Sequence, residues 1–271
     1  MTPEVLPRLV ATDLDGTLLR SDGTCSERTR ASLAAVEVAG IQVVLVTARP
    51  PRWLHELVDV VGEHGVVLCC NGAFVYDVRA GKILTERCIG AGVVGQIAGD
   101  LREALPGVAF AVENRLGFGR EWGFGDERTT AQDLTAALLE ELLDPLPGKM
   151  LARCDNVPAE HFHRVVQEVV GNRAVVSYSG ASGLAEISAR GVTKAAALGD
   201  WCAAQGIDPA DVFAFGDMPN DLPMLTWAGR SFGVANAHSD VLDMVDEVCA
   251  SNDDDGVAQV LDAALAAHST E

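Results

Sequence analysis

Short apolar runs and amphipathic stretches alternate along the first part of the chain. The apolar runs are continuous and rich in β-branched residues, which is typical of buried parallel strands, and they lie at 9–14, 41–46 and 66–70. Between them, Ser26 can cap a helix over 27–39, and Pro51 suits the first turn of a helix that extends to residue 61. The order strand, helix, strand, helix, strand predicts a doubly wound parallel sheet.

The same alternation returns near the C-terminus. Helices are expected over 193–204, 219–227 and 257–267 and from residue 239, with strands at 212–215, 231–234 and 247–250. The brief acidic run 253–255 is expected to be a solvated loop. Both ends of the chain therefore contribute to one α/β domain with a Rossmann-like arrangement.

The central stretch has a different character. It combines helical patterns at 93–105, 131–143 and 159–170 with alternating, strand-like segments at 108–113, 149–153, 174–178 and 184–188. We therefore expect an α+β domain over 83–188, inserted into a core formed by residues 1–82 and 189–271. Two linkers would join the inserted domain to the core.

Composition narrows the range of partners. The chain has 271 residues, of which 48% are hydrophobic, and a formal net charge of −19 from 20 basic and 39 acidic residues. Such an acidic surface repels nucleic acid and anionic lipid, so neither is expected as a partner. An anionic substrate would need locally placed cations. No oligomeric state is predicted.

Neither targeting signals nor disulfides are expected. No apolar run reaches the roughly 20 residues that a membrane helix needs, and the N-terminal segment does not resemble a secretory signal. The 7 cysteines form no Cys-x-x-Cys pair and have no framework spacing, so reduced thiols are the ordinary interpretation. These features favour a cytoplasmic protein.

Two carboxylates directly follow the first predicted strand. Asp13 and Asp15 lie two residues apart, so both can face one pocket as the chain leaves the strand. In open α/β sheets, ligands bind beyond the carboxyl ends of the strands. Two acids this close repel each other unless a cation intervenes, and a hard cation, Mg²⁺ by default, resolves that conflict. The alternative is a solvated turn, since Asp15-Gly16 is a common turn pair.

A second group of polar side chains follows the predicted strand at 212–215. Asp217, Asn220 and Asp221 are three oxygen-bearing side chains within five positions, enough to complete a magnesium site. A capped helix start is the alternative, with Asp217 or Asn220 as the N-cap. That alternative explains one acid and gives the other polar residues no role.

Groups that could bind an anion occur at two further element ends. Thr47 ends the strand at 41–46, and Lys194 lies in the first turn of a helix, where a cation opposes the macrodipole. An anion in the pocket explains such a lysine better than helix stability does. Arg49 and Asn71 lie near the same edge. A substrate contact for each is weighed equally against a salt bridge for Arg49 and an Asn-Gly turn for Asn71.

Taken in order, these segments resemble the four motifs of the haloacid dehalogenase superfamily. The motifs are Asp13-x-Asp15-Gly16-Thr17, Thr47, Lys194 and Gly216-Asp217-x-x-Asn220-Asp221. The segments 46–49, 71–73 and 216–225 are similar to Cof-type sugar-phosphate phosphatases, which carry a large α/β cap, called C2, between the second and third motifs. The resemblance covers the whole chain. Ala48, where many relatives have glycine, is a conservative departure.

The resemblance implies a chemical role for the matched residues. Asp13 would attack phosphorus and form an aspartyl-phosphate. Asp15 would protonate the leaving alcohol and then take a proton from the water that hydrolyses the intermediate. Thr47 and Lys194 would bind the phosphoryl oxygens, and Lys194 would also keep Asp13 ionised.

The resemblance also implies how Mg²⁺ would be held. Its ligands would be a carboxylate oxygen of Asp13, the backbone carbonyl of Asp15, and Asp217. Asn220 and Asp221 would orient bound water or neighbouring ligands. The domain inserted between the second and third motifs would act as a cap that sets substrate choice.

Asp15 distinguishes this chain from other branches of the superfamily. Dehalogenases lack the second aspartate and transport ATPases have threonine there, so the resemblance implies a phosphoric monoester hydrolase acting on small phosphorylated metabolites. A phosphomutase of the phosphomannomutase type remains an alternative. A signalling receiver domain is much shorter, and an inactive phosphate-binding protein would have no reason to keep Asp15 and Asp217 together. Sugar phosphates, phosphorylated cofactors and glycolytic by-products all fit as substrates.

Overall fold

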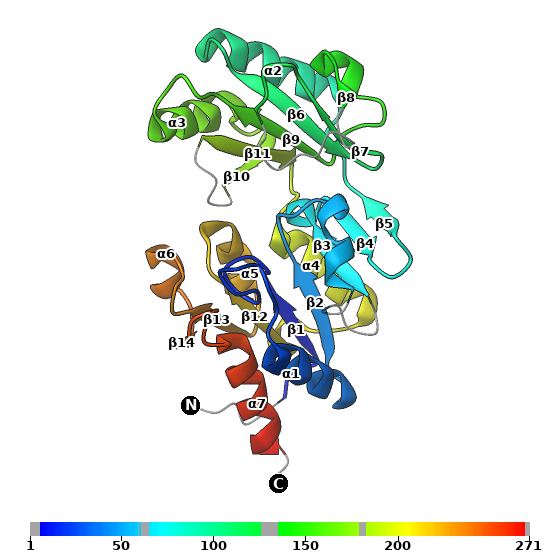
Figure 1. The fold of residues 1–271 in the computed structure, drawn as a ribbon, viewed down its shortest axis with the longest axis vertical. Helices are drawn as coiled ribbons and strands as arrows, with labels where there is room; N and C mark the ends of the chain where they lie inside the picture. The colour runs from blue at the N-terminus through cyan, green and yellow to red at the C-terminus, as the bar shows by residue number, and fades with distance from the viewer. Residues whose placement is uncertain (1–5, 59, 61–64, 126–134, 179–182, 269–271) are drawn as a thin grey trace.

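The computed structural model describes residues 6–58, 60, 65–125, 135–178 and 183–268. Within them, the chain forms two layered units stacked along the long axis of the molecule (Figure 1). The first and last parts of the chain build the larger unit, which we call the core, and the middle part builds the smaller one, which we call the cap.

Eight strands form the core sheet, in the order β14-β13-β12-β1-β2-β3-β4-β5. The strands from β14 to β3 are parallel, whereas β4 and β5 add an antiparallel hairpin at one edge that the sequence analysis missed. Their bounds are β1 Leu9–Thr12, β2 Gln42–Val46, β3 Val66–Cys69, β4 Phe74–Asp77, β5 Lys82–Glu86, β12 Val212–Gly216, β13 Arg230–Val234 and β14 Glu247–Cys249. The predicted parallel α/β sheet is confirmed.

Helices cover both faces of the core sheet. α1 and α7 pack on one face and α4 and α5 on the other (Figure 1). The side chains of β1 alternate between the two faces of the sheet. Because helices cover both faces, all of these side chains are buried. Val10 joins the α1 and α7 side and Ala11 the α4 side, both fully buried. The bounds are α1 Glu27–Val38, α4 Lys194–Gln205, α5 Leu222–Trp227, α6 Ser239–Leu242 and α7 Gly256–His268.

The cap is a six-stranded sheet with two helices on one face. Its strand order is β10-β11-β9-β6-β7-β8. Phe110, Met150 and Ile187 of the sheet pack against Ile97 of α2 and Phe162 of α3, which leaves the other face toward the core (Figure 1). The bounds are α2 Ala91–Ala104, α3 Ala159–Val170, β6 Ala109–Asn114, β7 Gly117–Arg120, β8 Thr135–Ala136, β9 Lys149–Arg153, β10 Ala174–Ser177 and β11 Leu184–Ala189.

Two of the predicted helices are wrong over the residues that the structure describes. Within the helix predicted over 131–143, whose first residues lie outside the described part, the chain forms β8 and a 3₁₀ turn at Leu139–Leu142. Pairing of β8 with β7 outweighs the helix propensity there. The helix predicted from Pro51 is replaced by 3₁₀ turns at Pro51–Trp53 and His55–Leu57. Arg52 in this segment is held by Glu113 of the cap, a contact that no local pattern encodes.

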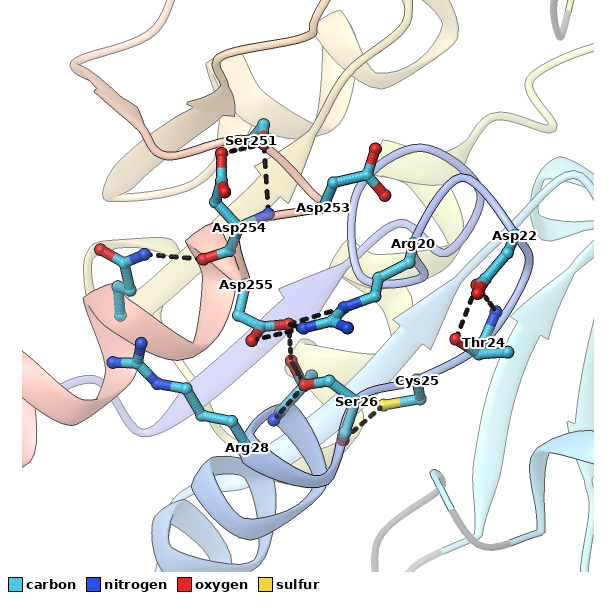
Figure 2. A network of polar contacts seen from close by, with 12 residues as sticks. Arg20, Asp22, Thr24, Cys25, Ser26, Arg28, Ser251, Asp253, Asp254 and Asp255 are labelled. Carbon is cyan, nitrogen blue, oxygen red and sulfur yellow. Dashed lines mark hydrogen bonds and ion pairs between the residues drawn. The ribbon is translucent and has the colours of Figure 1, made fainter.

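The acidic run 253–255 is not simply a solvated loop. The Asp255 carboxylate accepts hydrogen bonds from the Arg20 guanidinium at 2.9–3.2 Å, and only 12% of its side chain is exposed (Figure 2). Asp253 accepts hydrogen bonds from the backbone and hydroxyl of Ser21. These contacts join the segment after β1 to the start of α7, and so brace the loop that carries Asp15.

The limits of the predicted domains remain a proposal. The predicted boundary between residues 82 and 83 falls inside β5, which pairs with β4 of the core sheet. We therefore propose that the inserted domain begins after β5.

Among the described residues, no helix is both long and apolar enough to cross a membrane.

Candidate active site

The predicted site residues gather at one edge of the core sheet. Asp13 follows β1 and Asp217 follows β12, and these two strands are parallel neighbours. The amide of Asp13 donates to Phe215 O at 3.0 Å, so the backbone stays in register up to the first acid. Thr47 follows β2, the other neighbour of β1. Parallel strands end at the same edge, so these side chains reach one site.

Lys194 lies between two carboxylates at the start of α4. Its ammonium donates to Asp13 Oδ1 at 2.5 Å and to Asp221 Oδ1 at 2.6 Å. The lysine side chain is 2% exposed, and the two acids are 7% and 0% exposed. Thr193 caps the same helix through a hydrogen bond from Ala196 N. Two acids of the protein hold the lysine in place, and the anion in the pocket that the sequence analysis expected stays a prediction.

Asp217 and Asp221 have different hydrogen-bond environments. Asp221 Oδ2 accepts from the backbone amides of Asp217 and Met218, both at 3.1 Å, so both its oxygens are engaged. Asp217 Oδ1 accepts from the Thr17 hydroxyl at 3.0 Å. Among the described residues, the second carboxylate oxygens of Asp13 and Asp217 accept no hydrogen bond. These two oxygens are available to a ligand.

The electrostatics of the cluster favour a further cation. Burial raises the pKa of Asp13 to about 8, with Asp221 and Asp217 adding to the rise against the opposing effect of Lys194. Burial and Asp221 likewise raise the pKa of Asp217 to about 6. For Lys194, burial lowers the pKa, but Asp13 and Asp221 outweigh it and raise the pKa above its ordinary value. Lys194 lowers the pKa of Asp13, which is the direction that its expected role requires, and burial works against it.

The donor set fits a hard divalent cation. Oxygens of Asp13, Asp217 and Asp221 all lie within 4.8 Å of one another, and all three residues are buried. Three carboxylates face a single lysine, so the site carries excess negative charge. Carboxylate oxygens are the ligands that Mg²⁺ prefers. Since Asp221 is engaged by Lys194 and two amides, Asp13 and Asp217 are the side chains left to hold the ion.

The Asp15 carboxylate is held by Arg49. The guanidinium donates to both carboxylate oxygens, at 2.6 and 2.8 Å, and 57% of the Asp15 side chain is exposed. The backbone amide of Arg49 donates to the Thr47 hydroxyl at 3.0 Å. The salt bridge weighed for Arg49 is therefore the contact observed. A substrate contact for Arg49 stays a prediction.

Asn71 connects the core to the cap. It is 2% exposed and lies in the left-handed region, with φ of 56°, followed by Gly72 at 97°, which matches the Asn-Gly turn weighed above. Its amide Nδ2 donates to Glu186 Oε2 at 2.6 Å, and its Oδ1 accepts from Asn220 Nδ2 at 3.3 Å. Its backbone amide donates to Thr47 O. A substrate contact for Asn71 also stays a prediction.

The sequence analysis missed a buried charged group on the cap face toward the core. Lys149 of β9 lies 3.2 Å from Glu186 of β11 and donates to Ala48 O, next to Thr47, at 2.6 Å. Both side chains are nearly fully buried. The available signal was alternation: Lys149 stands one residue before Met150, which faces the cap helices, so the lysine faces the core.

The comparisons with known proteins identify the family that the sequence motifs resemble. Residues 10–261 match the family model of haloacid dehalogenase-like hydrolases. The chain belongs to this family. It is 26% identical to "Pyridoxal phosphate phosphatase YbhA" of Escherichia coli (strain K12), over 94% of this chain and 97% of the relative. It is 29% identical to "5-amino-6-(5-phospho-D-ribitylamino)uracil phosphatase YitU" of Bacillus subtilis (strain 168), over 95% and 97%.

A solved structure of the family supports the fold. The haloacid dehalogenase superfamily phosphatase BT1666 of Bacteroides thetaiotaomicron matches with a TM-score of 0.79 and 22% identity, over 95% of this chain and 94% of the other. The predicted fold class, an α/β core with a cap, is confirmed, as is membership of the superfamily. The predicted enzyme class, a phosphatase of this family, is confirmed at that level by the named relatives.

Proposed function

We propose that this protein is a Mg²⁺-dependent phosphatase that hydrolyses phosphomonoesters of small metabolites through an aspartyl-phosphate on Asp13. The observation that carries the proposal is the buried contact of Asp13 with Lys194 at 2.5 Å, inside a cluster of three carboxylates. This arrangement supplies a nucleophile, a cation for the phosphoryl group and oxygens for a metal at one point of the sheet edge.

In the first step, an Asp13 carboxylate oxygen attacks phosphorus as the bond to the leaving oxygen breaks. Asp15 gives its proton to the leaving alcohol, which departs as the neutral alcohol. In the second step, Asp15 takes a proton from a water molecule that attacks phosphorus, and the bond to Asp13 breaks to release phosphate. The Asp15 side chain is 57% exposed, so substrate and water can reach it once its contact with Arg49 is exchanged for one with the leaving oxygen.

The phosphoryl oxygens would be bound by Lys194 and Thr47. The Thr47 hydroxyl accepts from Arg49 N, so its own proton remains free to donate to an anion. Mg²⁺, when bound by Asp13, the carbonyl of Asp15 and Asp217, would supply charge neutralisation for the transferred group. Asp221 orients the site through Lys194 and two backbone amides.

The relatives support a small phosphorylated metabolite as the substrate. YbhA is named for pyridoxal phosphate and YitU for a phosphoribityl-amino-uracil, and both align with nearly the whole chain. The acidic surface, with its net charge of −19, makes a large polyanionic partner such as nucleic acid unfavourable. We therefore propose a small phosphate ester as the partner of this site.

Phosphate release from p-nitrophenyl phosphate tests the proposal. We expect no turnover in excess chelator and recovery on addition of Mg²⁺, with Asp13→Asn inactive at every Mg²⁺ concentration. Asp22→Asn, an exposed carboxylate on the loop after β1, is the matched control and should behave as the wild type. Retained turnover in Asp13→Asn, or full activity in chelator, would contradict the proposal.

A further inference from the structure

A cavity of about 490 Å³ lies between the cap and the core, directly beside Lys194. Asn71, Asn220 and Lys194 line its core side, and residues of β10 and α3 line its cap side. The volume is within the range of small-molecule sites, roughly 300–1,000 Å³. A phosphoryl group bound by Lys194 would therefore leave the rest of the substrate in this cavity.

The cavity offers few charges to a leaving group. Among its described lining residues there is no arginine and no carboxylate, and Lys194 is the one side chain with a formal charge. Val175, Val176, Pro219 and Pro223 supply apolar walls. A second phosphate or a carboxylate on the leaving group would have no cation to pair with here, so its burial would be unfavourable.

One wall is a pair of packed rings on the cap. The rings of His163 in α3 and Tyr178 after β10 have centroids 4.0 Å apart and are tilted by 37°. The Tyr178 hydroxyl donates to His163 O at 2.9 Å, which holds the tyrosine in place. Burial lowers the pKa of His163, which favours its neutral imidazole. The two rings give the cap side of the cavity an aromatic wall, which we call the His163–Tyr178 platform.

Two buried polar atoms beside the cavity have no hydrogen-bond partner among the described residues. They are His163 Nε2 on the cap side and Asn220 Oδ1 on the core side. Leaving a buried polar atom without a partner is unfavourable, so such atoms usually mark a place where a ligand or water completes the site. The two residues stand on opposite walls of the cavity, so a ligand that spans it lies next to both.

We infer that the leaving group of the substrate is a planar, uncharged aromatic or heteroaromatic alcohol that lies on the His163–Tyr178 platform. Polar ring substituents would complete the hydrogen bonding of His163 Nε2 and Asn220 Oδ1. Open-chain polyol phosphates would be poorer substrates because they have no ring to pack on the platform. Esters with a second anionic group would be poorer because the described lining of the cavity holds no second cation. This inference rests on the proposed phosphatase function.

The test compares two esters of similar leaving-group reactivity. The ratio of kcat/KM for 3-pyridylmethyl phosphate to that for glycerol 3-phosphate should exceed about ten in the wild type. In Tyr178→Leu, which keeps an apolar side chain but removes the ring, the ratio should fall by about threefold to tenfold, the usual worth of an aromatic contact. His161→Leu is the matched control. His161 is an exposed residue of α3, the helix that carries His163, and it does not line the cavity.

The outcomes separate this inference from the proposed function. Mg²⁺-dependent release of phosphate from both esters at equal kcat/KM, or an unchanged ratio in Tyr178→Leu, would overturn the inference and leave the phosphatase intact. No release from any ester would overturn the proposed function itself. If Tyr178→Leu does not fold, His163→Gln, which replaces the ring with a hydrogen-bonding amide, should lower the same ratio.

Discussion

The contact between Asn71 and Glu186 predicts that Asn71→Asp disables the enzyme by pushing the cap away from the core. The Asn71 amide lies 2.6 Å from the Glu186 carboxylate, and both residues are buried. The substitution keeps the shape of the side chain but places a second carboxylate where the donor was. Two negative charges at that distance repel by about 6 kcal/mol at an effective dielectric constant of about 20, and Lys149, 3.2 Å from Glu186, offsets part of this repulsion.

Proton uptake limits this penalty. An introduced aspartic acid with an ordinary pKa of about 3.9 can be kept protonated at pH 7 for about 4 kcal/mol, which is the smaller cost. We therefore expect kcat/KM to fall by up to about a thousandfold at pH 7. Like charge raises the pKa of the introduced group in the docked state, so the defect should shrink about tenfold per pH unit as the pH falls from 7 towards 5.

The double variant Asn71→Asp/Glu186→Gln decides the cause of the defect. With the opposing charge removed, kcat/KM should recover most of the loss, each variant being compared with the wild type at the same pH. Asn156→Asp, on an exposed part of the cap, is the matched control and should be near wild type. If Glu186→Gln gives no rescue, the introduced charge repels the substrate's phosphate instead, and the docking argument is wrong.

Two further predictions concern the acid cluster. Gly16 and Gly23 both have φ near +80°, but a Cβ on Gly16 would collide with the Asp217 carboxylate, whereas Gly23 has open space. Gly16→Ala should therefore abolish turnover while Gly23→Ala costs only about 1 kcal/mol of stability, and equal activity of the two in a phosphate-release assay would refute the geometry. Lys194→Met leaves Asp13 and its neighbours buried without their cation, so denaturant unfolding in chelator should show a loss of about 3 kcal/mol or more. An unchanged midpoint would contradict the buried ion pair.

Local patterns were sufficient to locate the acids and the lysine. Asp13 and Asp217 each follow a continuous apolar run, and a parallel sheet brings the ends of such runs to one edge whatever the rest of the chain does. Lys194 could be singled out because its position in the first turn of α4 is unfavourable for the helix itself. These signals depend on a few neighbouring residues, so they can be read without the fold.

Contacts between the two units could not be predicted in the same way. Glu186 meets Asn71 across 115 residues, and Arg52 meets Glu113 across 61, so no local period encodes either pair. The same holds for β8, where pairing with β7 outweighs the helical pattern of the sequence. The cavity beside Lys194 is likewise a product of how the cap lies on the core, which depends on these contacts.

The central claim is that Asp13 is the nucleophile that attacks phosphorus. Trapping the covalent intermediate tests this claim most directly. With an ester whose leaving group needs no proton, such as 2,4-dinitrophenyl phosphate, Asp15→Asn should form the aspartyl-phosphate but hydrolyse it slowly. Acid quench and peptide mass spectrometry should then find a hydroxylamine-labile phosphate on Asp13. Phosphate on any other residue, or an equal burst of product in Asp13→Asn, would contradict the account.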